Sequence, residues 1–161
     1  KNKKIKTLVC LGSGGHTSEM LQIIEILDKN KYEPIIYMLA DTDQTSLNKI
    51  NQLNLINNNN YYLIPRSRQV HQSYLTSVFS TIQSLIYVLY LLIFKINQLN
   101  LIICNGPGTC VPIILTSFIL YKLMYLNNNC KLIYIESICR QHTLSITGLI
   151  LFYFVDLFVI T

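Results

Sequence analysis

A glycine-rich turn near the start of the chain, Gly12-Ser13-Gly14-Gly15-His16, constrains the fold more than any other stretch. An apolar run, Thr7–Leu11, precedes the turn, and apolar residues at helical spacing follow it. This pattern predicts a strand, a tight turn and a helix, with Thr17 or Ser18 as the capping residue and Glu19 in the first turn. Backbone N–H groups of such a turn can approach a phosphate, and the helix dipole favours negative charge. We therefore predict an anion-binding turn between a strand and a helix.

Composition narrows the class of protein. The length of 161 residues predicts one domain over residues 1–161. Hydrophobic residues make up 51% of the chain and charged residues only 13%, which indicates membrane contact or an obligate partner. Basic and aromatic residues do not interleave, so we expect no nucleic-acid partner. The first lysines, Lys1, Lys3, Lys4 and Lys6, could meet an anionic membrane surface or simply be solvated.

Strand and helix patterns alternate along the rest of the chain. The short runs of asparagine, Asn57–Asn60 and Asn127–Asn129, are typical of surface loops. Helices are predicted after a cap at Asp41–Asp43 as far as Leu53, at Thr109–Leu126 and from Leu144–Gly148 to Phe154. Further strands are predicted at Pro34–Ala40, Tyr61–Ile64, Leu99–Cys104, Lys131–Ile135 and Asp156–Ile160. The alternation predicts an α/β fold, a Rossmann-like, doubly wound and mostly parallel sheet of about six strands.

The stretch Gln69–Phe94 contains no Asp, Glu, Lys or Arg. Its hydroxyl groups recur at helical spacing on an otherwise apolar cylinder, at Ser73, Ser77, Ser80, Ser84 and Tyr87. A membrane-spanning helix needs ~20 predominantly apolar residues, and the fully apolar part, Leu85–Phe94, is about half of that. We therefore favour an amphipathic helix that packs on the sheet and dips into the membrane interface over a true membrane span.

The five cysteines include no C-x-x-C pair, which predicts a reducing compartment and no zinc site. The glycine-rich turn also differs from two known nucleotide-binding motifs. Thr17 stands where the third glycine of a dinucleotide fingerprint belongs, and no Gly-Lys-Ser/Thr follows, as a P-loop requires.

Four polar or glycine-rich turns each follow a predicted strand directly: Gly12–His16, Pro65–Arg68, Asn105–Thr109 and Glu136–Arg140. In an open parallel sheet, ligands bind in the crevice beyond the carboxyl ends of the strands. We therefore expect the four turns to share one ligand site.

Particular side chains at this edge suggest chemistry. His16, at a helix N-terminus, could be a neutral base that takes a proton from a hydroxyl group, or only a structural residue of the turn. Arg66 and Arg68 would point to opposite sides of an extended segment, so we expect at most one of them to bind phosphate and the other to face solvent or lipid head groups. Glu136 could be an alternative base, or could pair with Arg140 across a helical turn.

Four motifs together resemble one family: LGSGGHTSEM (residues 11–20), IPRSRQV (64–70), CNGPGTCVP (104–112) and YIESICR (134–140). The family is the membrane-anchoring subunit of the transferase that adds the second N-acetylglucosamine (GlcNAc) to dolichyl-diphosphate-GlcNAc, the lipid precursor of N-linked glycans. Its members are similar to the N-terminal half of a two-domain, GT-B type glycosyltransferase, such as the bacterial enzyme that makes lipid II. The resemblance spans nearly the whole chain.

The resemblance implies that this chain forms one half of a two-subunit transferase. A separate cytosolic subunit would bind the donor UDP-GlcNAc, so that activity needs the heterodimer and this chain needs no cofactor of its own. No metal-binding residues are assigned to it, and the resemblance leaves any metal requirement of the reaction open. The location would be the cytosolic face of the endoplasmic reticulum membrane, with the nuclear envelope membrane as a second location. His16 would activate the acceptor hydroxyl, with Glu136 as runner-up. The acceptor diphosphate would be held by Gly12, Ser13, Gly14, Gly15, Thr17, Arg66, Asn105, Gly106, Gly108 and Thr109.

Two departures from the family pattern and two alternatives remain. Members usually carry an N-terminal membrane anchor, so anchoring is expected to fall to Gln69–Phe94 and the lysines, to other proteins, or to a segment outside this sequence. Members also continue past the Asp156–Val159 strand into a tail that docks the catalytic partner. One alternative function is a pure membrane scaffold that recruits the catalytic subunit without touching substrate. The other is a self-sufficient, nucleotide-dependent enzyme of Rossmann type.

Overall fold

The computed structural model describes residues 4–57, 60–69, 72–96, 98–124, 129–140 and 143–160. Six strands form one sheet in the order β3-β2-β1-β4-β5-β6, and all five neighbouring pairs are parallel. This topology confirms the predicted doubly wound sheet, because the chain starts in the centre and winds outwards in both directions. The strands are β1 (Thr7–Leu11), β2 (Ile35–Ala40), β3 (Tyr61–Ile64), β4 (Leu101–Asn105), β5 (Lys131–Ile135) and β6 (Leu157–Val159).

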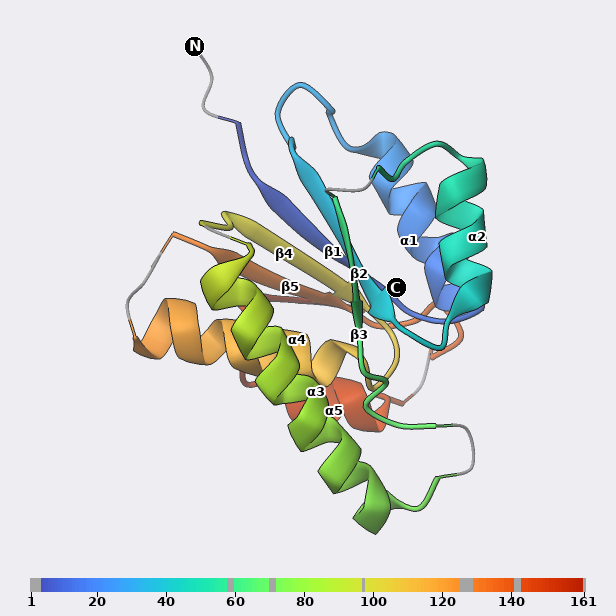
Figure 1. Cartoon of the computed structure of the whole chain (residues 1–161), viewed down its shortest axis with the longest axis vertical. Coiled ribbons are helices and arrows are strands. Elements are labelled where there is room, and N and C mark those ends of the chain that lie inside the picture. Colours follow the sequence, from blue (N-terminus) through green and yellow to red (C-terminus); the bar gives the residue numbers. More distant parts are fainter. Residues whose placement is uncertain are drawn as a thin grey trace.

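Helices cover both faces of the sheet (Figure 1). Helices α1 (Gly15–Ile26) and α2 (Gln44–Gln52) lie on one face. The other face carries α3 (Tyr74–Phe94), α4 (Cys110–Phe118) with a short π-helix after it, η1 (Ile119–Leu123), and α5 (Ile146–Leu151).

The central strands are buried on both faces, as continuous apolar runs predict. Leu8 and Cys10 of β1 belong to the hydrophobic cluster on the side of α3 and α4. Val9 and Leu11 alternate with them and belong to the cluster on the side of α1 and α2. The two clusters hold the turns beyond the strands on a rigid base.

Helix α1 begins before the residues that were predicted to cap it. Gly14 is the N-cap residue and the first helical residue is Gly15, so neither Thr17 nor Ser18 caps the helix and Glu19 lies beyond the first turn. The Thr17 side chain is fully buried and donates back to the Gly12 carbonyl oxygen, which explains why it does not cap the helix. By contrast, the predicted cap of α2 is confirmed, because Asp43 accepts a hydrogen bond from the Ser46 N–H at 3.1 Å.

Other helix boundaries also differ in part. Helix α4 gives way to the π-helix after Phe118, and residues 125–128, where the helix was predicted to end, lie outside the described residues. Residues 58–59 and 127–128 of the two predicted asparagine loops lie outside them too. Segment 136–140 contains a turn and no helix, and Arg140 donates to Thr143 Oγ1 at 3.4 Å instead of pairing across a helical turn.

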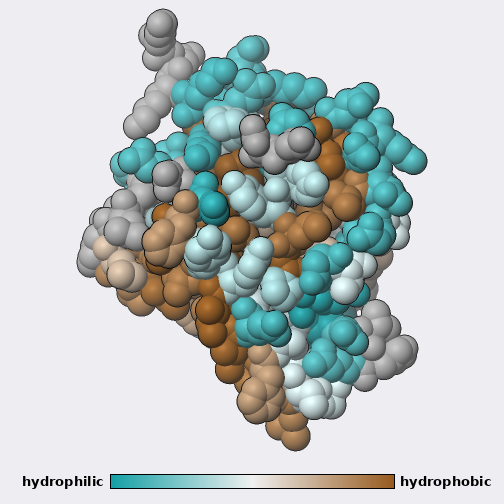
Figure 2. Space-filling model, in the orientation of Figure 1, coloured by the Kyte–Doolittle hydropathy of each residue, from teal (hydrophilic) through white to brown (hydrophobic). Residues whose placement is uncertain are grey.

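Helix α3 turns Ser77, Ser80 and Ser84 of the predicted hydroxyl stripe towards the protein and its apolar side outwards, whereas Tyr87, the last member of that stripe, is 41% exposed. Ser73 caps the helix, while Ser77 and Ser84 are buried against the protein. Large apolar side chains point to the solvent, with Phe79 exposed by 78% and Ile86 by 61%. Figure 2 shows the hydrophobic surface that runs along α3, in contrast to the hydrophilic side of α1 and α2. Within the described residues, Leu75–Phe94 is the one helix long and apolar enough to cross a membrane, and 28% of it is buried.

Asp156 ties the start of β6 to its neighbours. Its carboxylate accepts from the Leu132 N–H at 2.9 Å and from Lys122 Nζ at 3.1 Å. Burial alone would raise the pKa of Asp156, but the hydrogen bonds from Leu132 and Lys122 outweigh it and lower that pKa below its ordinary value.

A pH dependence of stability follows from this lowered pKa. Near the ordinary carboxyl pKa the unfolded chain binds more protons than the folded chain, so stability rises with pH there. We expect the contribution of Asp156 to be complete above the ordinary pKa and lost as the pH falls through the folded pKa. Urea unfolding of the Asp156→Asn variant between pH 3 and pH 6 should show a flatter pH dependence than the wild type. Equal slopes would contradict the assignment.

Candidate functional site

The glycine-rich turn presents an open helix N-terminus at the carboxyl edge of the sheet. Gly14 adopts a left-handed conformation, with φ at 66°, which glycine tolerates best. A Cβ atom added at Gly14 or Gly15 would meet no atom within 4 Å, so this side of the turn is open. The N-cap residue, Gly14, has no side chain that could cap α1, and the N–H groups of the first turn are therefore available to an anion.

The Asn105–Thr109 turn packs directly against the first turn. A Cβ atom on Gly12 would collide with the Pro107 ring, and one on Gly106 would collide with the imidazole of His16. Gly106 also has a φ of 89°, and its carbonyl oxygen accepts a hydrogen bond from the Tyr134 hydroxyl at 2.9 Å. Glycine at both positions therefore allows the two turns to meet.

The segment after β3 also reaches this edge. The Cβ of Arg68 lies 4.0 Å from the position that a Cβ on Gly108 would occupy. Ser80 and Thr81 of α3 donate to the Ser67 carbonyl oxygen at 2.5 and 3.3 Å, which fixes the segment to that helix. Arg68 donates to the Gln72 carbonyl oxygen at 3.1 Å. Arg66 is half-buried and makes no hydrogen bond or ion pair to the described part of the chain.

A hydrogen-bonded chain joins His16 to two further turns. Its Nδ1 lies 3.0 Å from Asn105 Oδ1, and Asn105 Nδ2 donates to Glu19 Oε2 at 3.0 Å. Ser137 Oγ donates to the other carboxylate oxygen of Glu19, also at 3.0 Å. Asn105 is almost fully buried, whereas the His16 side chain keeps 29% of its surface exposed. The imidazole is therefore held at Nδ1, while the side chain as a whole stays partly accessible.

Glu136 faces the protein interior. It is 1% exposed, and its Oε2 accepts hydrogen bonds from the Ser145 N–H and hydroxyl, each at 3.0 Å. Its Oε1 accepts from the Ser137 N–H at 3.2 Å. This arrangement secures the start of α5, which Ser145 caps, and of the two predicted base candidates it leaves His16 the accessible one.

An open pocket of about 300 Å³ adjoins this hydrogen-bonded chain. Glu19, Gln22 and Asn105 form its polar part, and the rest of its lining is Ile23, Ile26, Ile135 and Ile138. Ile26 is 83% exposed and Ile138 51% exposed, so apolar surface borders the polar groups of the site. Such a surface can take a sugar ring or an apolar segment of another protein chain.

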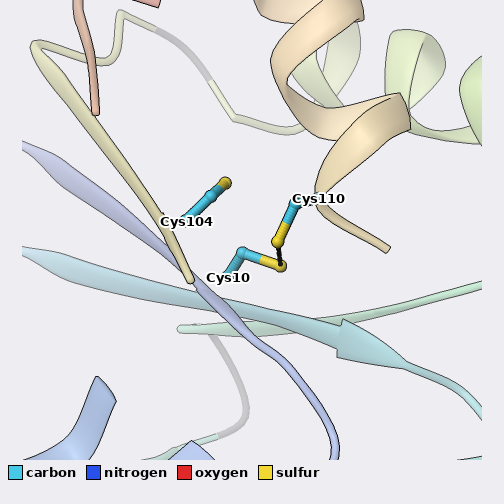
Figure 3. Close-up of side chains that lie close together, drawn as sticks. All are labelled: Cys10, Cys104 and Cys110. Atoms are coloured by element: carbon cyan, nitrogen blue, oxygen red, sulfur yellow. Dashed lines mark hydrogen bonds between the residues drawn. The ribbon is translucent and has the colours of Figure 1, made fainter. Parts of the chain in front are cut away.

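Three buried cysteines lie behind the two turns (Figure 3). The sulfur atoms of Cys10, Cys104 and Cys110 lie within 4.8 Å of one another, and Cys110 Sγ lies 3.7 Å from Cys10 Sγ and 3.6 Å from the Asn105 carbonyl oxygen. Hydrogen bonds from Cys104 and Cys110 lower the pKa of Cys10, whereas burial raises the pKa of Cys104 and of Cys110 well above the ordinary thiol value. At neutral pH the cluster therefore supplies at most one thiolate, and we interpret it as packing that supports the Asn105 turn.

Comparison with known proteins then identifies the family. A family described as "Oligosaccharide biosynthesis protein Alg14 like" matches residues 7–161. The chain belongs to the Alg14 family. The human protein named "UDP-N-acetylglucosamine transferase subunit ALG14" is 41% identical over 168 residues, which cover 98% of this chain and 76% of the human protein. The protein of the same name from Schizosaccharomyces pombe is 37% identical over 160 residues, which cover 95% of this chain and 73% of that protein.

A solved structure places this Alg14-family chain among glycosyltransferase folds. The crystal structure of Acinetobacter baumannii MurG matches with a TM-score of 0.69 at 13% sequence identity, over 99% of this chain and 41% of MurG. The likeness confirms the predicted fold, a Rossmann-like unit of the GT-B type. The family predicted from the four motifs is confirmed as well.

The structure brings the four predicted turns of this Alg14-family chain together, but it divides their side chains into two groups. Ser13, Gly14, Gly15 and Arg66 are at least partly accessible, as is His16. Gly12, Thr17, Asn105, Gly106, Thr109 and Glu136 are buried and support the site from behind. Glu19 and Ser137 belong to the site although they were not predicted as site residues. Both lie inside motifs that carry the family resemblance, Glu19 in LGSGGHTSEM and Ser137 in YIESICR, but no local pattern gave either of them a role.

Proposed function

We propose that this chain is the acceptor-binding subunit of a UDP-GlcNAc-dependent N-acetylglucosaminyltransferase that adds the second GlcNAc to dolichyl-diphosphate-GlcNAc. A separate catalytic subunit binds the donor UDP-GlcNAc, and this chain recruits it to the membrane. The chain then needs no cofactor of its own and is inactive alone. The names of its relatives, which call them transferase subunits, support this proposal.

The assignment of acceptor binding to this chain rests on two features that lie side by side. An open helix N-terminus and Arg66, which has no hydrogen-bond or ion-pair partner among the described residues, lie at the same edge of the sheet, and both favour a phosphate or diphosphate. The segment that carries Arg66 is fixed to α3, whose outer side is apolar. A diphosphate joined to a lipid has both features, a polyanionic head and an apolar tail.

The outward apolar side of α3 supports a membrane location. In this proposal α3 lies in the interface of the endoplasmic reticulum membrane on its cytosolic side, with the buried Ser77 and Ser84 towards the protein. Exposed apolar side chains also occur around α5 and β6, with Tyr153 exposed by 80% and Phe152 by 52%. This second surface is available to the catalytic subunit or to lipid.

The base in the proposed reaction is His16. Its side chain is partly exposed in the turn that carries the phosphate-binding groups, so it can take the proton from the acceptor hydroxyl while that hydroxyl attacks the donor sugar. Of the two predicted bases, Glu136 is already occupied in capping interactions.

The test measures GlcNAc transfer from UDP-GlcNAc with this chain, with the catalytic subunit, and with both. Two acceptors are compared, GlcNAc-diphosphate on a long lipid in membranes and on a short, water-soluble chain. We expect transfer to both acceptors only when both proteins are present. Transfer to the short acceptor by the catalytic subunit alone would favour the pure scaffold, and transfer by this chain alone would overturn the proposal.

A substitution of Arg66 tests the phosphate contact. Arg66→Ala should raise the KM for the lipid-diphosphate acceptor by about tenfold or more, because a charge-assisted hydrogen bond contributes roughly 1.5–3 kcal/mol. The KM for UDP-GlcNAc should not change. Lys29→Ala removes the same charge from an exposed position at the opposite edge of the sheet and should leave both constants unchanged. Equal acceptor KM values in the two variants would remove Arg66 from the acceptor site.

A further inference from the structure

The hydrogen bonds around His16 permit only one arrangement of protons. A carboxylate only accepts hydrogen bonds, so the Asn105 group that faces the Glu19 carboxylate is the amide nitrogen. The Asn105 oxygen then faces His16 at 3.0 Å, and a carbonyl oxygen also only accepts. The His16 Nδ1 must therefore carry the proton, which leaves the lone pair of the neutral ring on Nε2.

We propose that Glu19 and Asn105 are positioning residues that hold His16 in the Nδ1–H tautomer and present Nε2 as the base. This inference rests on the proposed function for the identity of the acceptor. It assigns a separate role to each of three residues. His16 takes the proton of the acceptor hydroxyl, Asn105 fixes the orientation of the His16 ring, and Glu19 fixes the orientation of the Asn105 amide.

The contacts of Glu19 hold its carboxylate in one orientation, as this positioning role requires. Ser137 Oγ donates to Oε1, so both carboxylate oxygens have partners and the side chain has a fixed orientation. The side chain is 15% exposed, and the amide between Glu19 and His16 is almost fully buried. His16 and Glu19 come from α1, Asn105 from the end of β4 and Ser137 from the segment after β5. The tautomer therefore depends on three segments that meet only in the folded chain.

The proton and electron balance of the transfer step is simple. The acceptor oxygen forms a bond to the anomeric carbon of the donor sugar, and its proton passes to His16 Nε2. The bond from that carbon to the UDP oxygen breaks, and UDP leaves with the electron pair. The imidazolium keeps its hydrogen bond to Asn105, and its Nδ1 lies 3.8 Å from Glu19 Oε2, so the carboxylate stabilises the new positive charge.

Nitrogen NMR of the imidazole tests the tautomer directly. The chain is labelled with 15N in its histidine rings and measured in complex with the catalytic subunit, and His16→Ala identifies the signal among the three histidines. We expect wild-type His16 to show a protonated Nδ1 and an unprotonated Nε2 at a pH where the ring is neutral. In Glu19→Gln the amide at position 19 can either donate or accept, so Asn105 can turn round and a mixture of tautomers should appear.

Glu25→Gln is the matched control, because it removes a carboxylate from an exposed position of the same helix. It should leave both the ring signals and transfer unchanged. Glu19→Gln should lower kcat by on the order of tenfold to a hundredfold with little change in the acceptor KM, since a positioned base contributes typically 10²–10⁴-fold. If Glu19 had only a structural role, Glu19→Gln would not change the tautomer of His16 in a complex that still assembles and keeps its unfolding temperature.

The outcomes separate the two proposals. A protonated Nε2 in the wild type, or a single unchanged tautomer in Glu19→Gln, overturns this inference whatever the activity. The expected tautomers together with full activity of His16→Ala would leave the positioning role of Glu19 standing as a structural fact and overturn the proposed role of His16 as the base.

Discussion

The His16→Ala variant, assembled with the catalytic subunit, is expected to lose transfer activity by a factor on the order of 10²–10⁴ in kcat, the usual contribution of a general base. The KM for the acceptor should change little, because the phosphate-binding turn and Arg66 remain. The loss should appear in single-turnover experiments as well, since the substitution affects the chemical step. Steady-state kinetics with saturating UDP-GlcNAc measure it.

A second substitution separates catalysis from packing. The His16 ring fills the space beside Gly106, so alanine also leaves a small void in the site. His16→Gln restores much of the side-chain volume and can still donate to Asn105, but it cannot take a proton. We expect His16→Gln to be as inactive as His16→Ala, with an unfolding temperature closer to that of the wild type. Recovery of activity in His16→Gln would show that the ring acts only by its shape.

The second large effect concerns the membrane. Phe79→Glu combined with Ile86→Glu should weaken binding to vesicles of a zwitterionic lipid by a factor on the order of 10². Burial of a Phe or Ile side chain contributes about 1.5–3 kcal/mol each, and the two carboxylates would have to be dehydrated in addition. Both side chains are more than half exposed, so the fold itself should not suffer. Vesicle co-sedimentation of the complex measures the effect.

The matched control places the same two charges on the other face of the sheet. Asn48→Glu combined with Gln52→Glu changes two exposed positions on α2. Circular dichroism should give similar unfolding temperatures for both double variants, and only the α3 variant should leave the vesicles. If both variants bind lipid equally, α3 is not the membrane-binding surface.

The sequence predicted the sheet well because its strands are signalled locally. Runs such as Thr7–Leu11 and Lys131–Ile135 are apolar, β-branched and followed at once by turn residues, and the structure has strands with these bounds. The Asp43 cap was predictable for the same reason, since its partner Ser46 is three residues away. The cap of α1 was predicted wrongly because Thr17 makes its hydrogen bond to Gly12, which the folded turn brings within reach.

The sequence predicted the location of the site, but only some of the roles of its side chains. Each of the four turns follows a strand, and parallel strands bring such turns to one edge. Which side chains face outwards depends on contacts between distant segments. Glu136 turns towards Ser145, and Glu19 is held by Ser137 across 118 positions of the chain. No local pattern predicts such pairs, and the direction of the hydroxyl stripe of α3 depended on the packing of that helix in the same way.

The contact between α3 and the segment after β3 links the depth of α3 in the membrane to the position of Arg66. Ser80 and Thr81 hold the Ser67 carbonyl oxygen, one residue from Arg66. The N-terminal half of α3 extends beyond the edge of the sheet where the strands end (Figure 1). In the proposed membrane location, how deeply α3 settles into the lipid therefore sets the height of the Arg66 segment above the bilayer. Acceptor lipids whose head groups stand at that height can be reached without lifting their tails out of the membrane.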